Sequence, residues 1–173
     1  MNQEKFFENF MLGVTSGHIP VEDRASNFAA VHKFTCSATL SLNIMSRSLD
    51  HTIYDRADIV EAFSNFIRRS RNSTVRILIY DSTNIIKDGH RLFTLAGKVP
   101  SKIVIRQLPD DFKDFNESMV IADRTGFLHN QQSDRYEGIV SFNDHQRCAE
   151  LNKTFTDFWD RSLMDSNLRQ IVI

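Results

Sequence analysis

The chain has 173 residues, of which 41% are hydrophobic and 25% charged, and this composition is typical of one soluble globular domain with a sizeable core. A formal net charge of −1 excludes the strongly basic proteins that bind nucleic acid without specificity, although it is compatible with a local basic patch. No run approaches the ~18 apolar residues of a membrane-spanning helix, so we expect no membrane span.

The beginning of the chain and its two cysteines indicate a cytoplasmic protein. The segment Met1–Phe7 lacks the basic region and the long apolar run of a signal peptide. Cys36 and Cys148 form no pairing motif, and helix-like sequence flanks each of them. We therefore expect two buried thiols in a reducing compartment, within a single domain over residues 1–173.

The first half of the chain predicts an arm, two helices and a strand. Residues 1–20 indicate a short helix followed by a loose arm, which clasps either its own domain or a partner subunit. A helix from Val21 to about Ala38 has apolar residues at three- and four-residue steps. The strand Leu40–Ser46 follows, and a second helix begins at Tyr54.

The second half predicts five strands and two helices. Thr74–Tyr80 is the clearest strand, because its β-branched and aliphatic residues suit a strand that is covered on both faces. A helix over Ile85–Ala96 comes next. The remaining predicted elements are Ser101–Gln107, Ser118–Ala122, Gly126–His129, Glu137–Phe142 and a final helix after Asn143.

Strand–helix–strand units of this length form right-handed parallel crossovers with helices on both faces of a sheet. The late strands add antiparallel neighbours. The order therefore predicts an α/β fold with a mixed, mostly parallel sheet flanked by helices.

Ionisable residues at strand ends are the candidate site. Three carboxylates, Glu117, Asp123 and Glu137, lie in the stretch Asp114–Phe142, and strand ends are where sites form in such sheets. Further residues that could converge there are Arg47, Asp50, Asp81, His90, Arg91 and Arg135. The alternative is a network of ion pairs that ties the loops to the sheet, because such networks use the same residue types.

His90 is the candidate acid, base or nucleophile among these residues. The alternative is a surface or capping histidine beside Arg91. Motifs for phosphate loops, dinucleotides and nucleophile elbows are absent, and the histidines and cysteines lack metal-ligand spacing. We therefore expect neither a metal nor a cofactor.

The order of elements resembles a single-copy domain of the phospholipase D superfamily. The resemblance is carried by the strands Val75–Asp81 and Ile103–Leu108, and by Phe155 and Trp159 in the last helix. It implies a phospholipase D-like fold over roughly residues 40–163. A narrower resemblance is to a bacterial domain family that is sometimes attached to acetyltransferases, which supplies a grouping and no activity.

The superfamily signature is His-x-Lys-x4-Asp, and the resemblance matches its last position to Asp123. Its Lys then falls on Ser118 and its His on Asn116. The family's His is the nucleophile and its Lys stabilises the phosphate charge, and Asn and Ser supply neither function. Glu137 stands where members often carry a carboxylate that orients the histidine. The resemblance therefore implies a degenerate active site.

Three functions follow as hypotheses. The first is a catalytically degenerate domain that acts as a binding or regulatory module for a protein or a phosphate-bearing ligand, held by Arg47, His90, Arg91 and Arg135. The second is a phosphodiesterase of the nuclease or phospholipase type, with relocated catalytic residues centred on His90. The third is a homodimeric scaffold, because single-copy members of the superfamily pair. Nucleic acid is not an expected partner.

Overall fold

A seven-stranded sheet forms the centre of the computed structural model, which describes residues 5–163. Its strands, in the spatial order β1-β7-β6-β5-β2-β3-β4, are β1 (Ile19–Val21), β7 (Gly138–Ser141), β6 (Gly126–Asn130), β5 (Ser118–Ala122), β2 (Ser41–Ser46), β3 (Thr74–Ile79) and β4 (Ile103–Gln107). The helices are α1 (Arg24–Ser37), α2 (His51–Tyr54), α3 (Ala57–Arg69), α4 (Thr83–Asp88), α5 (Arg91–Lys98) and α6 (His145–Arg161), with a short 3-10 turn at Asp110–Phe112.

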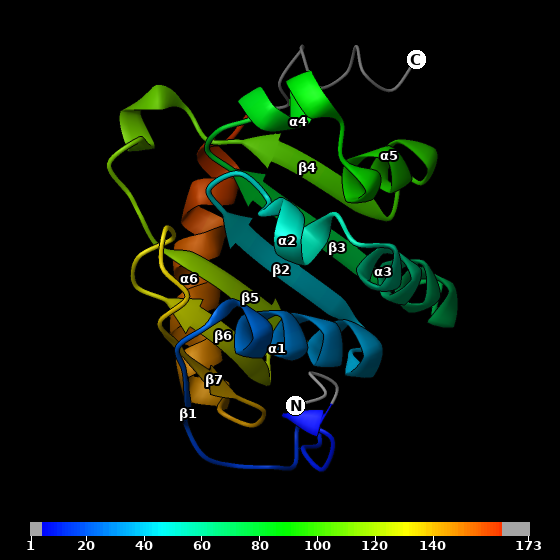
Figure 1. Cartoon of the computed structure of the whole chain (residues 1–173), viewed down its shortest axis with the longest axis vertical. Coiled ribbons are helices and arrows are strands. Elements are labelled where there is room, and N and C mark those ends of the chain that lie inside the picture. The colour runs from blue at the N-terminus through cyan, green and yellow to red at the C-terminus, as the bar shows by residue number, and fades with distance from the viewer. Residues whose placement is uncertain (1–4, 164–173) are drawn as a thin grey trace.

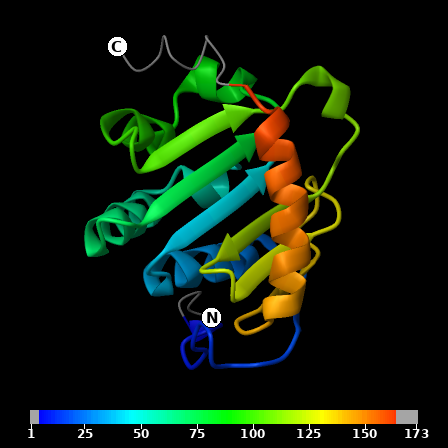
Figure 2. The same cartoon turned by 180° about the vertical axis from the view of Figure 1, so that it is seen from behind.

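The predicted α/β sheet flanked by helices is confirmed. Among the strands within residues 5–163, the pairs β2–β3 and β3–β4 are parallel, and the other four neighbouring pairs are antiparallel. Parallel pairs are therefore fewer than the sequence indicated, because the late strands and β1 all join the sheet in the antiparallel sense. Helices α1 to α5 lie on one face and α6 on the other (Figures 1 and 2).

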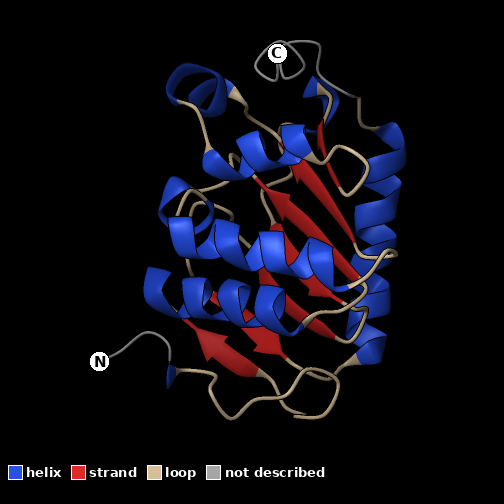
Figure 3. Cartoon of the chain, turned by 90° about the vertical axis from the view of Figure 1, so that its right-hand side faces the viewer, coloured by secondary structure: helices blue, strands red, loops and turns tan. Residues whose placement is uncertain are grey.

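Side-chain alternation along the strands divides the core into two parts. In β2, Ile44 packs toward the helices of the first face, whereas Met45 packs toward α6. The first part contains the fully buried Phe34 and Phe63, and the second contains Phe155 of α6. Figure 3 shows the resulting three layers, with the sheet between the two layers of helices.

The predicted helix in residues 1–20 is wrong for the described part of that segment. Lys5 has 3-10 geometry, residues 6–18 form turns and loop, and Ile19–Val21 is the edge strand β1. Phe7 is buried, and its ring centroid lies 5.4 Å from that of Phe142. The arm therefore packs on its own domain. This was one of the two predicted alternatives, the other being contact with a partner subunit.

Two predicted helices also differ in extent. The first begins at Arg24, because the Asp23 side chain caps it by accepting a hydrogen bond from the Ser26 backbone N–H at 2.8 Å. The predicted helix Ile85–Ala96 is two helices, because Gly89 has φ +75° and ends α4. Cys36 is exposed, so the prediction of two buried thiols holds only for Cys148.

Among the described residues no helix is both long and apolar enough to cross a membrane. Within the same part of the chain, no three potential metal-ligating side chains gather at one place.

Candidate functional site

A small cavity of about 40 Å³ lies where β2 ends and β5 begins, on the face that carries α1 and α2. Space of this size admits only a few water molecules or a group of similar bulk. Two predicted site residues, Asp50 and Arg135, line it. Its other polar walls are Asn27, Ser46, Ser118, Asn130, Ser133 and Tyr136.

Hydrogen bonds join several of these walls. The Tyr136 hydroxyl donates to Asp50 Oδ2 at 2.6 Å, and Asn130 Nδ2 donates to Asn27 Oδ1 at 3.0 Å. Asp50 Oδ1 caps α2 by accepting from the Thr52 N–H at 2.8 Å. Although burial opposes ionisation, hydrogen bonds from Thr52 and Tyr136 lower the pKa of Asp50. Asp50 is therefore a carboxylate at neutral pH and holds Tyr136 as a wall of the cavity.

Ser118 lines this cavity, and Asn116 is hydrogen-bonded to another of its lining residues. Asn116 is tied to Ser133: the Ser133 hydroxyl donates to Asn116 Oδ1 at 2.5 Å, and the Ser133 N–H donates to the Asn116 carbonyl at 2.6 Å. Ser118 begins β5 and stands opposite Asn130 in the β5–β6 register. Neither position presents an imidazole or a cation to the cavity.

Asp123 lies at the other end of β5. Its carboxylate accepts the backbone N–H groups of Thr39, Leu40 and Ser41 at 2.8, 2.8 and 2.9 Å. Because β5 runs antiparallel to β2, this end lies beside the beginning of β2. The five steps from Ser118 to Asp123 span about 17 Å of extended strand. The structure does not bring Asp123 to the cavity.

His90 is buried and precedes the first turn of α5. Its Nε2 lies 3.0 Å from the carbonyl oxygen of Leu49, so Nε2 carries the proton and donates it. Its Nδ1 is buried without a partner among the described residues. The His51 ring lies 5.2 Å away, centroid to centroid. Within residues 5–163, no hydrogen bond or ion pair joins the His90 side chain to Glu117, Asp123 or Glu137.

The burial of His90 predicts a pH dependence of stability. Burial lowers its pKa, and the Leu49 carbonyl and the Asp55 charge oppose that effect only in part. The unfolded chain therefore binds a proton at His90 more readily than the folded protein does. The neutral, buried His90 contributes its full share to the free energy of unfolding above the ordinary histidine pKa of about 6.5. That contribution is lost as the pH falls from there toward the lower pKa of the folded state. Between about pH 7 and pH 5, we expect the free energy of unfolding in urea to fall more steeply for wild type than for His90→Gln. Parallel curves would show that His90 titrates as it does in the unfolded chain.

Three other predicted residues do not line this cavity. The Arg91 backbone N–H donates to Asp55 Oδ1 at 2.7 Å, which joins α5 to the end of α2. Asp81 is exposed and accepts the Thr83 N–H at 2.9 Å, and hydrogen bonds from Thr83 lower its pKa. Arg47 is also exposed, and its carbonyl accepts the Asp81 N–H at 2.8 Å.

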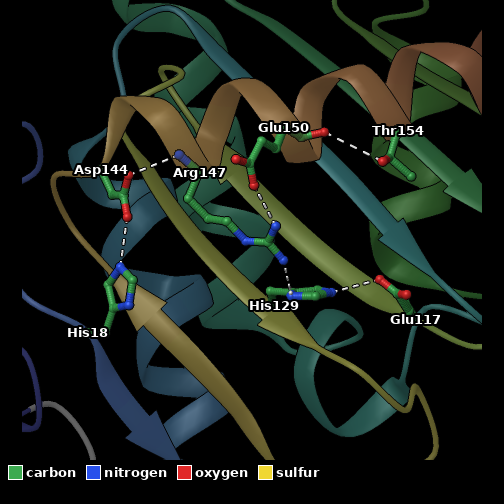
Figure 4. A network of polar contacts seen from close by, with 7 residues as sticks. All are labelled: His18, Glu117, His129, Asp144, Arg147, Glu150 and Thr154. Carbon is green, nitrogen blue, oxygen red and sulfur yellow. Dashed lines mark hydrogen bonds and ion pairs between the residues drawn. The ribbon is translucent and has the colours of Figure 1, made fainter.

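Glu117 belongs to a polar network on the α6 face of the sheet (Figure 4). Its Oε2 lies 2.7 Å from Nε2 of His129, whose side chain is 10% exposed. On the other side of the ring, Arg147 Nη2 lies 3.3 Å from His129 Nδ1. Since the guanidinium can only donate, Nδ1 is the acceptor and Nε2 donates to Glu117. Both nitrogens of His129 are thereby engaged.

The sequence analysis missed Asn27, Asn130, Ser133 and Tyr136 as cavity walls, and His129 as the partner of Glu117. Asn130 had a usable signal, because the short turn after Ala122 pairs it with Ser118. His129 had the same signal, because Glu117 directly precedes Ser118 in that hairpin. Tyr136 had none, since its partner Asp50 comes from a distant element.

Comparison with known proteins shows the fold. Nuc from Salmonella typhimurium, a phospholipase D family member, aligns with a TM-score of 0.65 and 16% identity over 86% of this chain and 97% of that one. NucT from Helicobacter pylori aligns with a TM-score of 0.61 and 13% identity over 87% of this chain and 100% of that one. The likeness extends to TrmBL2, an archaeal chromatin protein with a DNA-binding mode of its own, with a TM-score of 0.63 and 15% identity over 88% of this chain and 55% of that one.

The family described as "Domain of unknown function (DUF7931)" matches residues 23–171. A search of curated proteins finds no match. The likeness to Nuc and NucT confirms the fold that was predicted from the resemblance to the phospholipase D superfamily.

Proposed function

This chain belongs to the DUF7931 family and has the fold of phospholipase D family members, and from that premise we propose that it is a non-catalytic binding domain for a phosphate-bearing ligand, either free or on a partner protein. The proposed site is the small cavity between β2, β5 and α2, with Arg135 at its rim. The observation that carries the proposal is that Asn116 and Ser118 stand where the superfamily signature has its nucleophilic His and its charge-stabilising Lys.

Phosphodiester cleavage through a covalent intermediate needs a nucleophile and a positive group that stabilises the developing charge. Asn116 is a poor nucleophile, and its side-chain oxygen already accepts the Ser133 hydroxyl. Ser118 carries no charge. These two positions therefore lack the nucleophile and the positive group that turnover needs, which supports a role in binding.

The size and charge of the cavity limit the ligand. At about 40 Å³ it cannot admit a nucleotide or a lipid headgroup while Tyr136 stays bonded to Asp50, so only a group about as small as phosphate reaches Ser118. Arg135 supplies the positive charge at the rim, whereas Asp50 opposes an anion. We therefore propose that phosphate binds on the Arg135 side.

We expect binding without turnover. Calorimetric titration with inorganic phosphate should show weak saturable binding, which Arg135→Gln weakens about tenfold through the loss of a charge-assisted hydrogen bond. Asp50→Asn removes the opposing charge and should tighten binding. Arg71→Gln, at an exposed position outside the cavity, is the matched control.

The same preparations should release no nitrophenol from bis(p-nitrophenyl) phosphate. Hydrolysis by the wild-type protein that is lost in Ser118→Ala or Asp50→Asn would contradict the proposal. In that case an enzyme with relocated catalytic groups would be the better description.

A further inference from the structure

A second and larger cavity lies on the opposite face of the sheet, at the end of the β6–β7 pair. Its volume is about 310 Å³, at the lower end of the range for small-molecule sites. The residues that line it are His129, Gln131, Gln132, Arg135, Glu137, Gly138 and Ile139. It shares only Arg135 with the first cavity.

Two opposite charges border this cavity. Arg135 and Glu137 are both exposed, and within residues 5–163 their side chains make neither a hydrogen bond nor an ion pair, so both are available to a ligand. Arg135 would attract an inorganic anion, but Glu137 would repel it. Glu137 would attract a simple cation, but Arg135 would repel it. A ligand with both charges satisfies the two residues together.

The other residues that line this cavity are a histidine held in place by hydrogen bonds and several uncharged side chains. Glu117 and Arg147 engage both nitrogens of His129, so the imidazole is a positioned wall and not a free base. Gln131 and Gln132 offer amide donors and acceptors. Ile139 is 38% exposed and stands beside His129 in the β6–β7 register, which gives the cavity an apolar surface.

We propose that this cavity binds a small zwitterion of the α-amino-acid class. Arg135 holds the carboxylate in a forked hydrogen bond, Glu137 holds the ammonium group, and Ile139 contacts the side chain of the ligand. The glutamine amides complete the polar contacts. This site is separate from the proposed phosphate site, except for Arg135.

The test uses the full chain and leucine as the probe, with glycine and serine alongside, by isothermal calorimetry or ligand-observed NMR. Leucine should bind saturably at millimolar concentration. The two analogues that each lack one charge, 4-methylpentanoate and 3-methylbutylamine, should bind at least about tenfold more weakly. Glu137→Gln should weaken leucine to a similar degree and at the same time improve 4-methylpentanoate, because the repulsion is gone.

Ser118→Ala separates the two sites, because Ser118 lines only the first cavity and carries no charge that would act on Arg135. It should weaken phosphate binding and leave leucine binding unchanged. The proposal is overturned if none of the three amino acids binds saturably, or if 4-methylpentanoate binds the wild-type protein as well as leucine does. It is also overturned if the Glu137→Gln protein binds leucine with wild-type affinity. A cooperative thermal transition shows that this variant is folded.

Discussion

Replacing His90 with alanine is expected to lower the free energy of unfolding by about 2–3 kcal/mol. The side chain is buried, so its removal leaves a cavity between α5 and the segment before α2. Its hydrogen bond to the Leu49 carbonyl is lost as well, and that carbonyl belongs to a residue with φ +53°. Leu49 holds an unusual backbone conformation that the His90 contact supports. Urea denaturation at about pH 7 measures the change.

His145→Ala is the control, because His145 is an exposed residue in the first turn of α6. It should change stability by less than about 0.5 kcal/mol. The opposite pattern would favour a catalytic His90: an unchanged unfolding midpoint in His90→Ala, together with loss of a measured phosphodiesterase activity.

The strands of the central sheet were predictable because their pattern is local. Thr74–Ile79 is rich in β-branched and aliphatic residues, and Ser118–Ala122 and Gly126–Asn130 are separated by a short polar turn. Strand β1 was not predictable, since it has three residues, includes Pro20 and exists only by pairing with β7. The break at Gly89 was missed because helical spacing continues on both sides of it.

The candidate site was predictable only in part, because its contacts join elements that are far apart in the chain. Asp50 and Arg135 do line one cavity, as residues at strand ends were expected to. The bond from Tyr136 to Asp50 spans 86 positions, and no spacing rule indicates it. Grouping Glu117 with Asp123 followed from their nearness in sequence, yet an extended strand carries its two ends to opposite edges of the sheet.

Asp123 is therefore expected to act on stability, and Asp123→Asn should lower the free energy of unfolding by about 2 kcal/mol. Asparagine tolerates the φ of +51° at this position, so the backbone remains unstrained. The new amide group, however, has one acceptor oxygen instead of two. If that oxygen keeps Leu40 and Ser41, the NH₂ group faces the Thr39 N–H, and two donors oppose each other.

Asp134→Asn is the matched control: Asp134 is exposed and makes no side-chain hydrogen bond within residues 5–163, so its unfolding midpoint should equal that of wild type. Phosphate and leucine binding by Asp123→Asn should also match wild type below the unfolding transition, since both cavities lie at the far end of β5. An Asp123→Asn protein of normal stability that had lost phosphate binding would mean that Asp123 acts at the ligand site. The antiparallel course of β5 beside β2 argues against that result, because it holds the carboxylate at the beginning of β2, where three backbone N–H groups need an acceptor.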